Sequence, residues 1–301
     1  MDFRQLRTFA VVADLENITL AAARLRIAQS AVSRHVRLLE QELGVRLFER
    51  VGRGIKLTSA GQMLRERVGH LLEQMKQLEV DITTEGSTPS GTLRVGANPS
   101  FGHTLFPRIA EQYWAKYPNV RLHFVTDLTA SIQELVRRGD LDIAIIGFPD
   151  KDPDFIKTPL TTESIFLISA PSNDPDLGAE CTVRAISKLP LLLPGFQNRE
   201  RLGYERLAAA KGYHLTCRME ADSLSILKSL AARGFGHLLL PYVAIADDEP
   251  AGTWMLSRVK GFAVERYIIR LASRPLTEAG SSIIRLIQDE TGKLAKAGLL
   301  R

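Results

Sequence analysis

Residues 20–61 read LAAARLRIAQSAVSRHVRLLEQELGVRLFERVGRGIKLTSAG, and this stretch decides the fold of the N-terminal part of the chain. It starts as a short alanine-rich helix, for which Thr19 is a plausible N-terminal cap. After a short break, the apolar spacing predicts a helix over about 28–42 that stops at Gly44. Two such helices, packed on a first amphipathic helix predicted for residues 2–14, form a helix-turn-helix motif.

The third predicted helix carries a polar stripe opposite its apolar face. Gln29, Ser33 and Arg37 form one row with helical spacing, and Ser30 and Arg34 form a neighbouring row. In a major groove, Gln can pair with adenine, Ser with a base or a phosphate, and Arg with guanine or a phosphate. We therefore predict that Gln29, Ser30 and Ser33 contact bases, and that Arg37 contacts a phosphate. Arg34 is predicted to contact either, and an ordinary solvated helix face is the alternative.

A strand, a glycine turn and a second strand follow, which predicts a small hairpin or wing. Arg50, Arg53 and Lys56 place positive charge on this wing, where a minor groove or flanking phosphates would lie. The first sixty residues hold ten basic and six acidic side chains, so most of the net charge of +5 belongs to them. Such a basic terminal module favours a polyanionic partner.

A long helix is predicted over about 59–83, with Thr58 as its cap. Its apolar residues follow a heptad spacing, which favours a coiled coil with a second copy of the chain. The alternative is a helix that packs on the core of its own domain. Residues 85–91 are rich in Gly, Ser and Pro and are typical of a hinge. The heptad residues are Leu64, Val68, Leu71, Met75, Leu78 and Ile82.

The remainder of the chain, residues 91–301, alternates predicted strands and helices. Strands over 92–96, 120–126 and 141–146 with helices between them predict a parallel sheet covered by helices. A second block of the same kind follows, and the chain returns with a closing strand and a long helix. We therefore predict two α/β subdomains with a ligand-binding cleft between them. Their expected limits are 91–161 with 267–301 for the first, and 162–266 for the second.

Composition and motif searches exclude several classes of protein. Hydrophobic residues make up 45% and charged residues 24%, which is typical of a soluble globular protein. Cys181 and Cys217 are too few for a disulfide framework, and we expect both to be structural. The N-terminus lacks a signal-type apolar block and no run could span a membrane, so we expect a cytoplasmic protein. No catalytic motif, cofactor fingerprint or metal-ligand spacing is present, so neither an enzyme nor a cofactor is expected.

The chain resembles the LysR-type transcriptional regulators over its whole length. The resemblance is carried by residues 20–61, by LRVGA at 93–97, by LVRRGDLDIAI at 135–145, and by EADSLSILKSLAARGFGHLLLP at 220–241. The chain departs from the family pattern at Ala28, where a capping Ser or Thr is common, and it lacks a Pro after Ser30. Thr129 also stands where the family often has Gly, which puts the shape of the pocket in doubt.

Membership of this family implies an α+β multidomain protein. The expected parts are a winged helix-turn-helix domain over 1–58, a coiled-coil linker helix and hinge over 59–90, and a periplasmic-binding-protein-like effector domain over 91–301. Such regulators bind interrupted dyad sites in double-stranded DNA near promoters, act with RNA polymerase, and are usually homotetramers built from coiled-coil dimers. A ligand-binding protein or an enzyme with an added DNA-binding domain is the alternative.

The resemblance also implies where a small effector binds. The first strand of the effector domain should run into a loop that faces the ligand, and this loop also opens a helix whose free N–H groups attract an anion. A small organic acid is therefore the expected effector, although each residue could instead only cap a helix or fill the core. Two phenylalanines could hold an apolar body between them. The candidate residues are Asn98, Ser100, Phe101, Thr129, Ser131, Gly195 and Phe196.

Overall fold

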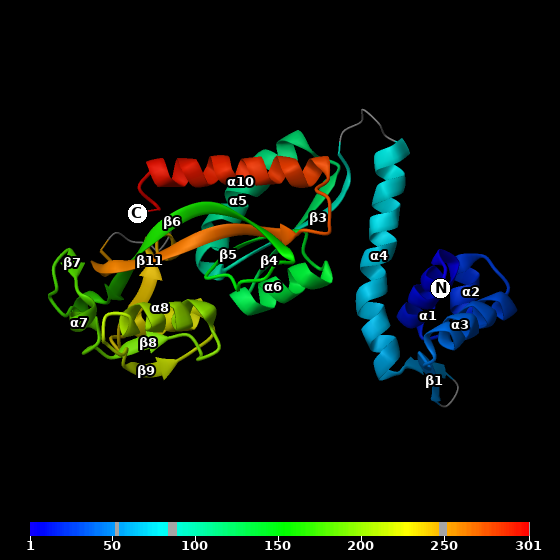
Figure 1. Cartoon of the computed structure of the whole chain (residues 1–301), viewed down its shortest axis with the longest axis horizontal. Helices are drawn as coiled ribbons and strands as arrows, with labels where there is room; N and C mark the ends of the chain where they lie inside the picture. Colours follow the sequence, from blue (N-terminus) through cyan, green and yellow to red (C-terminus); the bar gives the residue numbers. More distant parts are fainter. Residues whose placement is uncertain (52–53, 84–88, 247–251, 301) are drawn as a thin grey trace. The chain divides into compact units, whose positions relative to one another are not determined.

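A computed structural model of the chain describes residues 1–51, 54–83, 89–246 and 252–300. The chain divides into two compact units, which we call the N-terminal unit (Met1–Ser87) and the C-terminal unit (Thr88–Arg301). Figure 1 shows a small helical bundle with a hairpin and a long helix in the first unit, and a helix-covered sheet in the second. Each unit has its own buried core.

Three helices build the bundle of the N-terminal unit: α1 (Phe3–Leu15), α2 (Ile18–Leu25) and α3 (Gln29–Leu43). The cap of α2 is Asn17, whose side chain accepts hydrogen bonds from the backbone N–H groups of Thr19 and Leu20. The prediction of Thr19 as cap is therefore wrong by two residues, since Asn is an equally good capping residue and stands earlier.

Helix α3 agrees with the sequence-based prediction to within one residue at each end. Ala28 is its N-cap and makes no side-chain capping bond, as expected from the missing hydroxyl. Gly44 ends the helix in the left-handed conformation. Val32, Val36 and Leu39 form the buried face, which packs into the apolar clusters shared with α1 and α2.

The wing consists of β1 (Phe48–Val51) and β2 (Gly54–Leu57), which pair antiparallel. Its base is bonded to the start of the long helix. The backbone N–H of Thr58 donates to the Leu47 carbonyl at 3.0 Å, and the Thr58 hydroxyl donates to the Arg46 carbonyl at 2.7 Å. The same hydroxyl accepts from the N–H of Gly61, so Thr58 caps the helix as predicted.

Helix α4 (Ser59–Thr83) confirms the predicted long helix, but its heptad row is divided between two environments. Leu64 and Val68 pack against the core of their own unit, which matches the alternative interpretation for this end. Leu71 and Met75 are 47% and 43% exposed and remain available to another chain. The side chains of Leu78 and Ile82 and the hinge residues 85–88 lie outside the described part of the chain.

The first part of the C-terminal unit has the predicted β-α-β-α-β order. Strand β3 (Gly91–Ala97) pairs in parallel with both β4 (Val120–Thr126) and β5 (Ile143–Gly147). Helix α5 (Pro99–Lys116) and the final helix α10 (Glu278–Lys296) pack together on one face of the sheet, and α6 (Thr129–Arg138) covers the other (Figure 1).

Two long strands are the main feature that the sequence-based prediction missed. Strand β6 (Phe155–Ser169) and strand β11 (Met255–Leu271) pair antiparallel along most of their length. The apolar pattern is continuous only over residues 164–170 and 267–272, so the sequence predicts only short strands there. The polar first half of β6 is extended because β11 pairs with it. In the large sheet the strand order is β10-β6-β11-β5-β3-β4, where β10 is Leu238–Pro241, and β7 (Glu180–Cys181) pairs beside β11.

The rest of the C-terminal unit forms a second subdomain with its own apolar clusters around Ile165, Leu191 and Leu239. A separate parallel pair, β8 with β9, lies beside the large sheet's far end. The long strands β6 and β11 contribute to both subdomains and so connect them. The remaining elements are β7 (Glu180–Cys181), α7 (Val183–Ile186), β8 (Leu191–Leu193), α8 (Arg199–Ala209), β9 (Cys217–Glu220), α9 (Leu224–Ala232), β10 (Leu238–Pro241) and two short 3-10 turns, Pro171–Asn173 and Tyr242–Ala244.

Candidate functional site

The polar stripe of α3 lies open on the surface of the N-terminal unit. Gln29, Ser30, Arg34 and Arg37 are exposed, and Ser33 is half-buried between them. None of these five side chains makes a hydrogen bond or an ion pair with another described residue. Their donors and acceptors are therefore free to meet an external partner.

Two further side chains of α3, which the sequence-based prediction did not select, fix its position. The Thr8 hydroxyl donates to the Arg4 carbonyl and therefore accepts from His35 Nδ1, which lies 2.9 Å away. Glu40 Oε1 accepts from the backbone N–H groups of Leu47 and Phe48 at 2.7 and 3.2 Å. Glu40 thus connects the polar helix to the base of the wing. The sequence does carry a signal for Glu40: it is an acidic residue four positions after Val36, on the buried side of the helix.

The two described basic residues of the wing strands, Arg50 and Lys56, do not share one face. Arg50 stands opposite Ile55 and Glu49 opposite Lys56 in the strand register, so Arg50 and Lys56 point to opposite sides of the hairpin. Both are exposed, and each can approach a phosphate from one side only. Arg53, which we also predicted to contact DNA, lies outside the described residues.

The predicted effector residues Asn98 and Thr129 are engaged in bonds inside the protein. Asn98 Oδ1 accepts from the Gly147 N–H at 3.0 Å, and Asn98 Nδ2 donates to the Thr129 hydroxyl at 3.1 Å. That hydroxyl donates in turn to the Gly147 carbonyl. Thr129 and Ser131 are also not caps, because α6 begins at Thr129 and Leu128 occupies the cap position.

The expected pair of phenylalanines does not form. Phe101 is 0% exposed and belongs to the core under α5, whereas Phe196 is 67% exposed. Phe101 therefore fills the core, as the alternative interpretation expected, because α5 turns its apolar side to the sheet. The backbone N–H of Gly195 donates to Asp222 Oδ1 at 2.9 Å, so this loop is held by an acidic side chain.

A small cleft separates the two subdomains at the start of α5 and α8. Its volume is about 40 Å³, which is room for a few water molecules. Two of the predicted residues, Asn98 and Ser100, are among the twelve that line it. The others used below are Leu128 from the first subdomain and Asn198, Glu200, Asp222, Leu224, Leu227 and Leu240 from the second.

A buried arginine lies behind the lining of this cleft and is bonded to two of the lining residues, Ser100 and Glu200. Arg266 on β11 has a fully buried side chain, and its Nε donates to Glu163 Oε2 at 2.6 Å. Its Nη1 donates to Glu200 Oε1 at 3.0 Å and its Nη2 to the Ser100 hydroxyl at 3.2 Å. We call these four residues the Arg266 cluster. It joins the first turn of α5 to the first turn of α8 and therefore bridges the two subdomains.

Two buried polar atoms, one in the Arg266 cluster and one beside it, have no partner among the described residues. Glu163 Oε1 and the Tyr204 hydroxyl oxygen make no hydrogen bond with any described residue. Burial raises the pKa of Glu163, although the neighbouring Arg266 opposes this effect. Burial also raises the pKa of Tyr204, which lies close enough to feel the charges of the cluster. The sequence carried no signal for this cluster, because its members are far apart along the chain.

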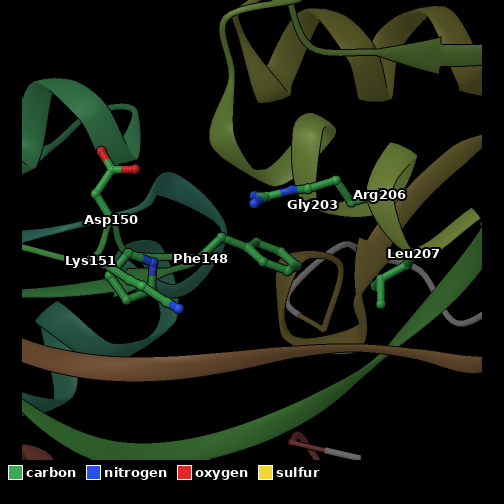
Figure 2. A pocket seen from close by; sticks show the side chains of 7 residues that line it. Phe148, Asp150, Lys151, Gly203, Arg206 and Leu207 are labelled. Atoms are coloured by element: carbon green, nitrogen blue, oxygen red, sulfur yellow. The ribbon is translucent and has the colours of Figure 1, made fainter. Parts of the chain in front are cut away.

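A second hollow, of about 550 Å³, lies between residues 148–151 and α8. In Figure 2, Phe148 points toward α8 and the Arg206 head group extends back toward the 148–151 loop. Phe148 has a φ of 48°, and a Cβ atom at Gly203 would come within 2.6 Å of its ring. Asp150 and Arg199 form an ion pair at 2.6 Å across the same boundary. The close approach of Phe148 to Gly203 and the ion pair between Asp150 and Arg199 thus form a second contact between the subdomains.

Comparisons with known proteins identify the family. A profile described as the LysR substrate binding domain matches residues 86–292, and one described as a bacterial regulatory helix-turn-helix protein of the lysR family matches residues 3–62. The chain therefore belongs to the LysR family: it is a DNA-binding transcriptional regulator with an effector-binding domain. The fold class predicted from the sequence is confirmed.

Similar proteins with curated names include the HTH-type transcriptional regulator BbuR of Bordetella bronchiseptica. It is 31% identical over 252 residues, which cover 84% of this chain and 78% of that protein. The transcriptional dual regulator GltC of Bacillus subtilis is 33% identical over 258 residues, covering 84% and 85% of the two chains. Transcriptional regulators are not enzymes, so at the level of the family a non-enzymatic role is supported.

Solved structures of full-length regulators share the fold. A full-length OxyR variant from Pseudomonas aeruginosa superposes with a TM-score of 0.71 at 24% identity, covering 97% of this chain and 94% of that one. CbnR, a LysR family transcriptional regulator, gives a TM-score of 0.67 at 18% identity, covering 97% and 99%. None of the helices in the described ranges combines the length and apolar character that a membrane span requires.

The two cysteines allow a prediction about oxidation. One similar protein is a hydrogen peroxide-inducible genes activator of Escherichia coli, which is 28% identical over 252 residues that cover 82% of this chain and 81% of that protein. Burial raises the pKa of Cys181 to about 11 and also raises the pKa of Cys217. Both thiols are therefore protonated at neutral pH and react slowly. We expect wild-type protein and the double variant Cys181→Ser/Cys217→Ser to bind DNA equally in gel shifts with or without hydrogen peroxide. A peroxide response in the wild type that the double variant lacks would contradict this.

Proposed function

We propose that the chain is a sequence-specific regulator whose activity changes when a small molecule binds in the cleft of the C-terminal unit. The observation that supports this most strongly is the surface of α3. Its five polar side chains make no hydrogen bond or ion pair with any other described residue. A helix that is anchored through His35 and Glu40 presents this surface without needing it internally. Such a rigid, basic helix face suits a major groove.

Pairing of two chains through α4 is part of this proposal. Met63, Leu71 and Met75 leave apolar surface uncovered on one helix of a single chain. A second α4 would cover it and would place two copies of α3 on the two half-sites of a dyad. A tetramer built from two such dimers, and contact with RNA polymerase at the promoter, extend the same proposal.

The chemical class of the effector is a finer part of the proposed function. The sequence favours an organic acid because α5 opens at the predicted ligand loop. In the structure, Ser100 in the first turn of α5 is bonded to Arg266, and that guanidinium already holds two carboxylates. The charge of the effector therefore depends on which groups of the cleft are left unpaired.

Gel shifts on the DNA upstream of the protein's own gene test the DNA-binding part. Ser33→Ala and Arg34→Ala should each weaken binding to the cognate site by about 1–3 kcal/mol, with less effect on scrambled DNA. Arg4→Ala removes the same charge from α1, outside the polar stripe, and should weaken both DNAs alike without changing their ratio. Equal binding of cognate and scrambled DNA by the wild type at physiological salt would refute sequence-specific recognition.

A further inference from the structure

We propose that the hollow between residues 148–151 and α8 is a second ligand site, which takes a small carboxylate on a flat apolar body. The site is separate from the cleft, because none of the twelve residues that line the cleft lines the hollow. It goes beyond the proposed effector cleft and does not depend on it. Three features of the described residues carry it: unpaired positive charge on both walls, a fixed aromatic face, and a helix shared with the cleft.

The first feature is positive charge on both walls of the hollow. Lys151 belongs to the wall from the first subdomain, and it makes no hydrogen bond or ion pair with a described residue. Arg206 belongs to the α8 wall. Its Nε donates to the Leu202 carbonyl at 3.1 Å, and its two terminal amino groups bond to no described residue. Figure 2 shows this guanidinium extending toward the 148–151 loop, so cations from two walls are available to one anion.

The acidic groups near the hollow are already engaged. Asp150, the one carboxylate among the described lining residues, pairs with Arg199 at 2.6 Å, and Lys157 Nζ donates to the Asp150 backbone carbonyl. Glu205 on α8 accepts from Arg201 Nε at 2.8 Å. An incoming anion therefore displaces no internal carboxylate and meets an excess of positive charge. A guanidinium fork matches the two oxygens of a carboxylate, which favours that group as the anion.

The second feature is the apolar surface between these charges, which Phe148, Pro149 and Leu207 supply. The Phe148 ring stands edge-on to Tyr204 with the ring centroids 6.0 Å apart, and it fits because residue 203 is a glycine. The φ of 48° at Phe148 is rare for a bulky residue and costs free energy, so the surrounding contacts hold the ring in this position. A fixed aromatic face beside a guanidinium suits a flat ring that carries the carboxylate.

The third feature is the helix that the hollow shares with the cleft. Glu200 in the first turn of α8 lines the cleft, and Arg206 further along the same helix lines the hollow. The hollow measures about 550 Å³, within the range of about 300–1,000 Å³ that small-molecule pockets have. A ligand that joins Arg206 to Lys151 would fix α8 against the 148–151 loop. It would thereby also fix the opening of the cleft at the start of that helix.

Four probes, measured by calorimetry on the full-length protein, test the ligand class: phenylacetate, 2-phenylethanol, 2-phenylethylamine and inorganic phosphate. Phenylacetate should bind with a Kd of about 1 mM or tighter. The other three should bind at least about tenfold more weakly, since each lacks either the negative charge or the aromatic ring. Absent binding of phenylacetate, or equal binding of the amine or of phosphate, would overturn the proposal.

Arg206→Gln and Lys151→Gln locate the site, because they remove the two cations from opposite walls. Both side chains are exposed, so neither change disturbs a core. Arg206→Gln should weaken phenylacetate binding about tenfold through loss of a two-pronged charged bond, and Lys151→Gln about threefold. Arg218→Gln removes the same charge from an exposed position of the same subdomain outside the lining, and should leave the affinity unchanged. Wild-type affinity in both lining variants would count decisively against the site.

Hydrogen exchange distinguishes the hollow from the cleft. With phenylacetate bound, the backbone amides of residues 148–151 and 203–207 should exchange more slowly. Protection confined to residues 98–104 and 221–228 would instead place the ligand in the cleft and overturn the proposal.

Gel shifts on the same samples test the proposed function separately. Arg206→Gln should discriminate between cognate and scrambled DNA as the wild type does, because it changes only the C-terminal unit. Specific DNA binding without phenylacetate binding would overturn the second site alone. Phenylacetate binding at the hollow in a protein that binds both DNAs equally would keep the site and refute the sequence-specific regulator.

Discussion

Replacing Arg266 by methionine should lower the free energy of unfolding of the C-terminal unit by about 3–5 kcal/mol. The change leaves Glu163, which is 1% exposed, and the largely buried Glu200 without their shared partner. A buried charge that loses its partner cannot recover its hydration and becomes strongly destabilising. Urea unfolding followed by tryptophan fluorescence measures this unit selectively, because Trp114 and Trp254 both lie in it.

A matched control is available on the same strand. Arg258 pairs with Glu180 at the surface, with its side chain 51% exposed, so Arg258→Met should cost no more than about 1 kcal/mol. Adding Glu163→Gln to Arg266→Met should recover part of the larger loss by removing the stranded carboxylate. Similar losses for Arg258→Met and Arg266→Met would show that burial of the cluster has no energetic consequence.

The loss caused by Arg266→Met should also depend on pH. Burial already raises the pKa of Glu163 in the folded protein above its unfolded value, and removing the guanidinium raises it further. The protonated form needs no cationic partner, so the loss should be greatest at neutral pH and should shrink as pH falls and Glu163 takes up its proton.

Gly61→Ala should destabilise the N-terminal unit by about 1–3 kcal/mol. A Cβ atom at this position would lie 2.1 Å from the Leu47 carbonyl oxygen and 2.8 Å from a methyl group of Leu57. The carbonyl is fixed by its hydrogen bond from Thr58, so it cannot simply move aside. Hydrogen exchange of residues 1–51 in the full-length protein should speed up, and specific DNA binding should weaken with it.

Gly69→Ala is the control for this prediction, because it makes the same change in the same helix. Nothing lies within 4 Å of a Cβ atom at Gly69, and the position is exposed. Alanine is a better helix former than glycine, so this variant should be stabilised by about 0.5–1 kcal/mol. Equal effects of the two substitutions would mean that the contact with the wing base is not tight.

The parts of the fold that could be predicted are those specified by local sequence. Helix α3, its glycine stop and the Thr58 cap follow from residues only a few positions apart. The parallel order of β3, β4 and β5 follows from alternating strand and helix patterns. The length of β6 could not be predicted, because its polar half becomes a strand only through pairing with β11, about a hundred residues later.

The two candidate sites show the same difference between features that local sequence specifies and features that depend on distant residues. The polar stripe of α3 was visible because helical spacing alone places its residues on one side. The Arg266 cluster was not, since Glu163, Glu200 and Ser100 lie 103, 66 and 166 positions from Arg266. Asn98 and Thr129 are candidate effector residues in the sequence because it shows that a residue is polar but not whether a partner inside the fold already uses it.

The pairing of β6 with β11 is interrupted at two places, between Arg258 and Ala263 and between Arg266 and Tyr267, and the second of these adjoins the Arg266 cluster. Arg266 stands opposite Thr161 and Tyr267 opposite Pro159, so Leu160 has no counterpart. A ladder with an extra residue on one side bends more easily there than where every pair is made. We therefore expect a rotation of one subdomain against the other to bend the ladder beside Arg266. A ligand that changes the charge around this guanidinium would act where the ladder bends. A small shift of the Arg266 side chain would there be coupled to a rotation of a whole subdomain.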